Sequence, residues 1–283
     1  MQLDAALRSF ARHCGGQPDV RVLYRASTPE MESLYEIAER EHPSVEFVSE
    51  IDFRTQVIEI LGQTRHILFV VDDAIFVRPF PLGRLAVALD TDQTIVGASL
   101  RLGKNTTYCY PLGIDQGVPP MVPESDAAAA WSGLYRFSHL GKAGDFGYPL
   151  EVSSSLYRSK DVLRWLGVEQ ILGTTRRGVP FSGPNTLEAT LAAVHTRDQP
   201  WLQPWLLCFG LSVAFCNPIN VVQSLYPNRA GSNVDYSSSA LARRFADSER
   251  IRIEDFDGYV PRGCHEEVVL TFERQRQAPV SSR

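Results

Sequence analysis

Apolar residues recur at helical spacing in three early segments of the chain and form short, strand-like runs in three others. Thr28 followed by Pro29, and later Asp52, supply the start signals of the second and third helices. The pattern therefore predicts helices over residues 3–10, 29–38 and 53–62, and strands over residues 19–24, 45–48 and 66–71. This alternation is typical of an α/β fold with a Rossmann-like, mostly parallel sheet flanked by helices.

The third of these strands is the most hydrophobic, and it runs directly into Asp72 and Asp73. An apolar run without polar alternation is typical of a parallel strand covered on both faces. Ligands bind at the carboxyl ends of strands in open α/β sheets, so both carboxylates are expected at a binding site. Adjacent carboxylates repel each other, and a divalent cation with oxygen ligands would neutralise them. The alternative is an acidic turn that caps the following segment.

Beyond residue 76 the alternation becomes irregular. We expect a short helix over residues 82–89, a strand over 94–102 and a long loop over 103–123. A group of aromatic residues beside Asp145 follows. Its members are Trp131, Tyr135, Phe137, Phe146 and Tyr148. Aromatic faces beside carboxylates suit a sugar ligand. For any single ring core packing is the better explanation, so only the group as a whole is informative.

The 283 residues, 44% of them apolar, are enough for one domain with a large core. We expect a single catalytic domain over residues 1–275, followed by a polar tail over 276–283. A nucleotide-binding half would span about 1–103, and an acceptor-binding half about 104–275.

Charge and cysteine usage exclude several classes of function. The net charge of -5 argues against a nucleic-acid partner, since such proteins usually carry a basic patch. The five cysteines are scattered, as is typical of reduced thiols in a cytosolic protein. The longest apolar segment, residues 206–215, is about half of the roughly 20 residues that span a bilayer. We expect a cytoplasmic protein without a transmembrane segment.

The order of motifs resembles that of nucleotide-sugar-dependent glycosyltransferases of the GT-A fold, in a bacterial, family 2-like branch. The matching segments are residues 66–76, 97–105, 148–158 and 183–188 and a late histidine, His265. They cover nearly the whole chain, and their order carries the resemblance. It implies metal-dependent, inverting transfer of a sugar from a nucleotide-sugar donor to a hydroxyl of a glycan or another acceptor.

The resemblance also nominates site residues. Asp73 would be a ligand of Mn²⁺ or Mg²⁺ at the donor's diphosphate, and His265 is a candidate further ligand. Asp72 would contact the donor's ribose or the metal. Arg25 and Arg101 are candidate contacts to the donor.

Three departures from the family's pattern stand out. Ala74 lies where an Asp-x-Asp motif has its second acid, and Arg25 follows a strand after which many relatives have a base-binding aspartate. The chain also opens directly on the helix over residues 3–10, so the family's first strand is missing. We expect Met1 to be a late start that lost this strand, and nucleotide binding to be weak as a result.

An inverting transfer needs a carboxylate that deprotonates the acceptor hydroxyl. The candidates are Glu188 and Asp145, with Glu151 as a third. Glu188 has a competing explanation, because Asn185 would cap the next helix and a glutamate three residues later would complete a capping box. In the catalytic explanation, the positive end of that helix keeps Glu188 ionised beside the acceptor.

Asp90 and Asp92 support a different hypothesis. Residues 86–94 match the Asp-x-Asp-x-Thr signature of haloacid-dehalogenase-like phosphohydrolases, in which the first aspartate is the nucleophile and the second an acid/base. The apolar residues before Asp90 read as a helix, which argues against this signature. A catalytically inactive nucleotide-binding protein is the third hypothesis, and the missing strand favours it.

Overall fold

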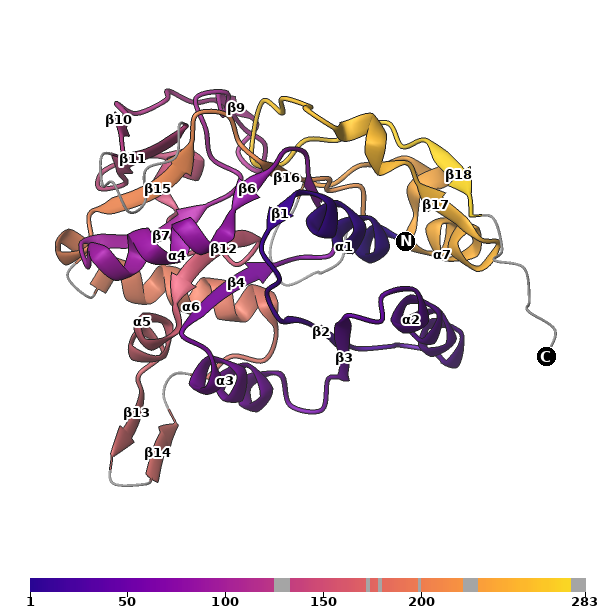
Figure 1. Ribbon diagram of the computed structural model, residues 1–283, viewed down its shortest axis with the longest axis horizontal. Helices are drawn as coiled ribbons and strands as arrows, with labels where there is room; N and C mark the ends of the chain where they lie inside the picture. The colour runs from indigo at the N-terminus through magenta and orange to yellow at the C-terminus, as the bar shows by residue number, and fades with distance from the viewer. Residues whose placement is uncertain (125–132, 172–173, 178–179, 198–199, 221–228, 276–283) are drawn as a thin grey trace.

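A computed structural model describes residues 1–124, 133–171, 174–177, 180–197, 200–220 and 229–275 (Figure 1). The helices of this part of the chain are α1 (Gln2–His13), α2 (Pro29–Glu41), α3 (Phe53–Gln63), α4 (Leu82–Thr91), α5 (Ser159–Trp165), α6 (Pro184–Arg197) and α7 (Ser238–Ala246). The expected polar tail lies outside the described residues.

The central sheet has six strands in the order β10-β11-β15-β7-β12-β4. These strands are β4 (His66–Val70), β7 (Ile95–Ser99), β10 (Val122–Pro123), β11 (Leu134–Ser138), β12 (Ser154–Arg158) and β15 (Trp205–Phe209).

The remaining strands form two-stranded sheets. The pairs are β1 (Cys14–Gly15) with β6 (Phe80–Pro81), β2 (Val20–Tyr24) with β3 (Val45–Ser49), β5 (Ala74–Phe76) with β16 (Ala214–Cys216), β8 (Tyr108–Cys109) with β9 (Ile114–Asp115), β13 (Val168–Ile171) with β14 (Thr174–Arg177), and β17 (Glu249–Ile251) with β18 (Phe272–Arg274).

The elements predicted for the first hundred residues are confirmed, each to within a few residues at its ends. The helix starts follow the predicted chemistry. The Thr28 hydroxyl accepts a hydrogen bond from the Met31 backbone N–H, and the Asp52 carboxylate accepts one from that of Thr55 at 3.0 Å. Local sequence therefore determines this first part of the chain, up to the end of β4.

The expected mostly parallel sheet is not found, although an α/β architecture is confirmed. Within the described six-stranded sheet only β7 and β15 pair in parallel, and the other pairings are antiparallel. The reason is the position of β12, which lies between β4 and β7 and is antiparallel to both. Strands β4 and β7 therefore run in the same direction without touching. The parallel pairing that the sequence pattern predicts is found between β2 and β3.

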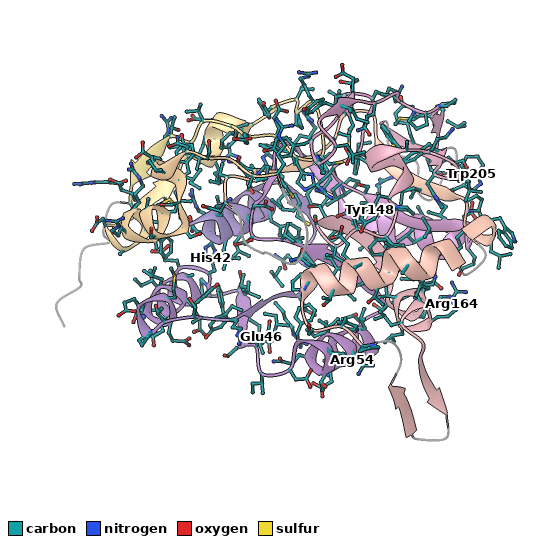
Figure 2. All side chains as sticks on the ribbon, turned by 180° about the vertical axis from the view of Figure 1, so that it is seen from behind. His42, Glu46, Arg54, Tyr148, Arg164 and Trp205 are labelled. Carbon is teal, nitrogen blue, oxygen red and sulfur yellow. The ribbon has the colours of Figure 1, made fainter. Side chains whose placement is uncertain are left out.

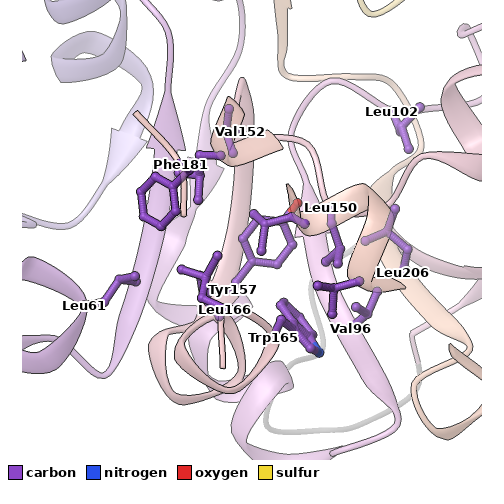
Figure 3. Close-up of a cluster of buried hydrophobic side chains, with 14 of the residues drawn as sticks. Leu61, Val96, Leu102, Leu150, Val152, Tyr157, Trp165, Leu166, Phe181 and Leu206 are labelled. Carbon is purple, nitrogen blue, oxygen red and sulfur yellow. The ribbon is translucent and has the colours of Figure 1, made fainter. Parts of the chain in front are cut away.

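Helices cover both faces of the central sheet, with α4 in front in Figure 1 and α6 in front in the reverse view of Figure 2. The larger core cluster lies between the sheet, α3, α5 and α6 (Figure 3). Gly97 in β7 packs closely against Tyr157 of this cluster, since an added Cβ would come within 2.6 Å of the Tyr157 ring. Among the described residues, no helix combines the length and apolarity needed to cross a bilayer.

Candidate functional site

The two aspartates lie in the turn that joins β4 to β5, at the carboxyl end of β4 as predicted. This strand is at the edge of the six-stranded sheet. The backbone carbonyl of Asp73 accepts a hydrogen bond from the Asn217 N–H at 2.9 Å. Its side chain shares a hydrogen bond with the Cys216 thiol. The Oδ1 atom of Asp73 is buried and has no hydrogen-bond partner in the described structure. An orphaned carboxylate oxygen of this kind is a candidate position for a cation or a ligand donor.

Burial raises the pKa of both carboxylates, and the negative charge of Asp72 adds to the rise at Asp73. Removal from water, followed by the negative charge of Asp72, raises the pKa of Asp73 to about 6. Asp72 is exposed to solvent, but it lines a cleft. The surrounding protein atoms displace much of the water around its carboxylate, and this desolvation raises its pKa. The positive charge of the chain's amino terminus opposes that rise. Both carboxylates would be stabilised by an added positive charge.

Arg101 lies at the centre of a group of buried charged and polar side chains, which we call the Arg101 cluster. Its side chain is almost fully buried, and Nη2 donates to the Glu151 carboxylate at 2.8 Å. Its positive charge also acts on four titratable side chains from distant parts of the sequence. These are Asp73, Asp145, Glu188 and His265. The structure thus gathers around one guanidinium the residues that the sequence nominated separately. Both terminal nitrogens of this guanidinium have partners, whereas Nε is buried and has no hydrogen-bond partner in the described structure. Arg101 is therefore a positioning group for its neighbours, and its contact to the donor stays a prediction.

His265 forms a backbone bridge with Cys216, whose thiol shares a hydrogen bond with Asp73. Nη1 of Arg101 lies 3.1 Å from Nε2 of His265, and a guanidinium can only donate, so Nε2 accepts. The ring proton of the neutral imidazole is then on Nδ1. The lone pair on Nε2, with which the ring could bind a metal, already accepts the hydrogen bond from Arg101. Burial, followed by the charge of Arg101, lowers the pKa of His265 to about 3, so the ring stays neutral. To bind a metal, His265 must first separate from Arg101.

The described residues contain no group of three or more His, Cys, Asp and Glu side chains arranged to hold a metal ion. Mg²⁺-type sites often use only one or two carboxylates together with substrate phosphates. Asp73, with its orphaned Oδ1, and the neighbouring Asp72 fit such a site. The chain therefore fits a cation that arrives with a phosphate-bearing ligand better than one held by protein ligands alone.

The capping explanation for Glu188 is wrong. Helix α6 begins at Pro184, one residue before the expected cap, and the Thr186 hydroxyl accepts hydrogen bonds from the backbone N–H groups of Ser182 and Gly183 at 2.8 and 3.0 Å. Thr186 thus makes the capping contacts that the sequence assigned to Glu188. The sequence signal misled because Pro184 fits the first helical position better than Asn185 fits the cap.

Glu188 instead belongs to the Arg101 cluster. Burial, followed by the negative charge of Glu151, raises the pKa of Glu188 to about 7. Arg101, the Tyr148 side chain and the Val152 backbone act in the opposite direction. Tyr148 remains 39% exposed, on the face of the molecule that α6 covers (Figure 2). A carboxylate with a pKa near neutrality is suited to exchange protons with a ligand at physiological pH.

The other two candidate bases are held by neighbouring side chains. Glu151 accepts from Arg101, from the Ser153 backbone N–H and from the Ser155 hydroxyl. Asp145, in a short 3₁₀ turn over Gly144–Gly147, exchanges two hydrogen bonds with the amide of Gln116 at 2.9 and 3.0 Å. Burial raises the pKa of Asp145. Both carboxylates organise the site, and Glu188 is the better candidate for proton transfer.

The aromatic group divides into core and surface. Phe137 and Phe146 are fully buried and pack edge to face, with ring centroids 5.3 Å apart. Tyr135 is partly buried, with the Lys104 ammonium 4.0 Å from its ring centroid. Trp131 lies outside the described residues. Tyr148 is therefore the member of the group that lies beside the Arg101 cluster.

The sequence missed a pair of tyrosines at the end of β2. The rings of Tyr24 and Tyr35 stack with centroids 4.2 Å apart, and both line a cleft of about 900 Å³ that also reaches Arg25 and Asp72. The Arg25 side chain is 80% exposed. The negative charge of Asp72 contributes to a raised pKa at Tyr35, so β2 and β4 end near each other. The sequence feature that could have indicated this pair is the position of Tyr24, next to Arg25 at the end of a predicted strand.

The phosphohydrolase hypothesis is wrong for Asp90 and Asp92. Asp90 lies within helix α4 and pairs with Arg65 and His66, and Asp92 pairs with Arg136 at 2.8 Å. The signature requires the first aspartate at the end of a buried strand. The apolar residues before Asp90 are helical because their spacing buries Leu85, Ala88 and Leu89 on one face.

The Arg101–Glu151 pair should dominate the stability of the site. Arg101→Met leaves Glu151 buried without its charge partner, and we expect a loss of about 3–5 kcal/mol in the free energy of unfolding. Arg25→Met removes an exposed arginine and should cost less than about 0.5 kcal/mol. Urea unfolding of both variants measures the difference. A loss below about 1 kcal/mol for Arg101→Met would show that the pair is not a structural centre.

The chain was compared with family models and with curated proteins. No family model matches it. Over 247 residues, 80% of the chain, it is 24% identical to the bifunctional glycosyltransferase pgtA of Dictyostelium discoideum. The chain spans about a third of that protein, 31% of its length.

Proposed function

We propose that this protein is a glycosyltransferase of the GT-A type that moves a sugar from a nucleotide-sugar donor to an acceptor hydroxyl. The observation that carries the proposal is the cluster around Arg101, which contacts Glu151 and His265 and whose charge acts on Asp73, Asp145 and Glu188. The similarity to a bifunctional glycosyltransferase supports a glycosyltransferase role in general. The metal dependence is our inference from Asp72 and Asp73 and from the resemblance to GT-A glycosyltransferases, and the inverting course follows from that resemblance alone.

The donor would bind across the ends of β2 and β4. The stacked Tyr24 and Tyr35 and the exposed Arg25 line the part of the cleft that suits a nucleoside. Asp72 lines the same cleft and is exposed, so it can accept a hydrogen bond from the ribose. The diphosphate would then lie beside Asp73.

A divalent cation held by Asp73, with Asp72 beside it, would act as a Lewis acid on the oxygens of the leaving diphosphate. The chain's own contribution is to keep Asp73 in place. The backbone of Asn217 and the thiol of Cys216 bind Asp73, and the charge of Arg101 favours its ionised form.

Glu188 would be the base that takes the proton from the acceptor hydroxyl. Its raised pKa means that the protonated product of this step is stable in the site. Glu151 contributes by raising that pKa, and its hydrogen bonds to Arg101 and Ser153 hold it at a fixed position. A base on one side of the sugar and a leaving group on the other would give inversion.

The pH dependence of transfer follows from these values. Because only the ionised carboxylate accepts a proton, kcat/KM should rise about tenfold per pH unit below pH 7 and level off above it. Protonation of Asp73 should steepen the profile below about pH 6. Initial rates between pH 5 and 8.5 measure this. A profile that is flat from pH 5.5 to 7.5 would be incompatible with Glu188 as the base.

A donor screen tests the function itself. The protein is incubated with Mn²⁺ and a panel of nucleotide sugars, and released nucleotide is quantified. We expect one or a few donors to be turned over. Asp90→Asn provides the matched control, because it alters the rival phosphohydrolase signature on helix α4 and should leave turnover unchanged.

A further inference from the structure

Two consecutive large apolar side chains are exposed at one end of the molecule. Trp201 is 62% exposed and Leu202 58%, and both belong to the short 3₁₀ turn η2 (Pro200–Leu202) between α6 and β15. The described part of the chain has no other exposed tryptophan and no other two consecutive exposed residues of this size and kind. We call Trp201 and Leu202 the exposed pair. Their exposure to water is unfavourable, because both side chains are large and apolar.

The exposure does not come from a loosely held turn, because the next residue, Gln203, is bound on several sides. Its side-chain oxygen accepts a hydrogen bond from Nη2 of Arg164 at 3.1 Å, and its side-chain nitrogen donates to Asp161 at 3.1 Å. Its backbone carbonyl accepts a hydrogen bond from Nε2 of His139 at 2.9 Å. These contacts fix the turn to α5 and to the segment after β11. The exposed pair is therefore held at the surface by its neighbour.

Cations lie beside the exposed pair. Lys160 and Arg164 of α5 are both exposed. The Lys160 ammonium donates to the side chain of Gln93 at 3.2 Å, and the backbone of Gln93 accepts from Gln203 at 3.4 Å, so all of these groups lie together. No described carboxylate forms an ion pair with Lys160, and the one carboxylate of α5, Asp161, is buried and already paired with two arginines. This surface is locally positive, although the whole chain has a net charge of -5.

The exposed pair lies far from the Asp72–Asp73 turn. Strand β12 starts opposite Val70, next to this turn, and ends opposite His66. Helix α5 follows β12 directly, so its cations lie at the opposite end of the sheet from the aspartates. Figure 2 shows Arg164 and Trp205, the first residue of β15, at the same end of the molecule. A partner bound here would leave the cleft open to solution.

We propose that the exposed pair and the cations of α5 form a docking surface for an anionic lipid membrane. Tryptophan is favoured at the boundary between lipid and water, and lysine and arginine near this boundary are attracted by anionic headgroups. The two apolar side chains would insert at the level of the headgroups, with the cations above them. The proposal is independent of the chemistry proposed for the site.

Two other occupants fit the surface less well. A twofold contact between two copies of the chain would bring the cations of α5 close to the same cations of the second copy, and these repel each other. A specific protein interface usually buries about 800 Å² on each partner, and two apolar side chains supply a small part of that area. A membrane requires no such area, because it surrounds each inserted side chain with lipid.

Sedimentation with vesicles tests the surface without donor or acceptor. One set of vesicles contains phosphatidylcholine alone, and the other contains phosphatidylcholine and phosphatidylglycerol at about three to one. We expect the unmodified protein to bind the anionic vesicles, and Trp201→Ala/Leu202→Ala to bind them at least about tenfold more weakly. The matched control is Val234→Ala/Val269→Ala, which truncates two residues that are each 79% exposed elsewhere and should bind like the unmodified protein. Melting curves verify that both double variants are folded.

Two further measurements separate charge from insertion. Lys160→Gln should weaken binding to the anionic vesicles about fivefold, because it removes one cation from the surface. Brominated lipid quenches the fluorescence of an inserted tryptophan. We therefore expect quenching in the unmodified protein and its loss in Trp201→Phe, which keeps an aromatic ring and should still bind.

The proposal would be overturned if the unmodified protein did not bind the anionic vesicles, or if the variant of the exposed pair bound as well as its control. Equal binding to neutral and anionic vesicles would also overturn it, since the cations would then have no part. Binding without quenching would place another surface on the membrane. Oligomers that form in the unmodified protein but not in Trp201→Ala/Leu202→Ala would show that a second copy covers the exposed pair.

Discussion

Glu188→Gln should reduce the rate of sugar transfer by about 10²–10⁴-fold while the protein remains folded. Glutamine keeps the size of the side chain and its hydrogen bonds to Tyr148 and Val152, but it cannot take the acceptor's proton. The folded-state pKa of Glu188 is raised, so the ionised carboxylate opposes folding increasingly as pH rises toward 7. The variant should therefore melt at the same or a higher temperature at pH 8. Rates with saturating donor and melting curves at pH 8 measure both effects.

Asp145→Asn is the control for this prediction. Asparagine can still accept one hydrogen bond from Gln116, so we expect a loss of transfer well below that of Glu188→Gln. The reverse order of effects would move the base to Asp145 and leave Glu188 as a buried structural carboxylate.

Asp73→Asn should abolish metal-dependent turnover and weaken the binding of Mn²⁺ in the presence of a nucleoside diphosphate. The amide lacks the negative charge that a hard cation prefers. In the described structure Oδ1 of Asp73 is buried without a hydrogen-bond partner, so it is free to bind the cation. Folding should not suffer, because burial and the charge of Asp72 disfavour the ionised form. Calorimetry of Mn²⁺ with the nucleoside diphosphate measures the affinity independently of turnover.

His265→Ala distinguishes a site in which His265 stays bound to Arg101 from one in which His265 binds the metal. Since Arg101 uses the lone pair of His265, this variant should bind Mn²⁺ about as tightly as the unmodified protein. A matching loss in His265→Ala and Asp73→Asn would show that His265 leaves Arg101 to bind the metal. Retention of full Mn²⁺ affinity by Asp73→Asn would remove Asp73 from the metal site.

The first part of the fold, up to the end of β4, could be predicted because its signals are local. The Thr28 and Asp52 caps and the apolar run into Asp72 each act within a few residues. The order of the sheet could not, since β12 inserts between β4 and β7 from about 60 residues further along the chain. Only long-range packing determines that pairing.

The candidate site shows the same division. Asp73 was identified from its position at the end of a strand, and the structure places it there. The role of Arg101 as the shared partner of Glu151 and His265 depends on contacts 50 and 164 residues apart, and no spacing in the sequence indicates them. Glu188 was nominated as a candidate base, and the competing capping explanation proved wrong. It lies in the cluster because α6 packs against the core through Leu187.

The most direct test of a glycosyltransferase is the detection of its product. The donor found in the screen is incubated with Mn²⁺ and a panel of hydroxyl acceptors, and products are identified by mass spectrometry for the unmodified protein and Glu188→Gln. We predict an acceptor whose mass increases by one sugar residue with the unmodified protein and remains essentially unchanged with Glu188→Gln. Nucleotide release without any glycosylated acceptor, at equal rates in both proteins, would contradict this account.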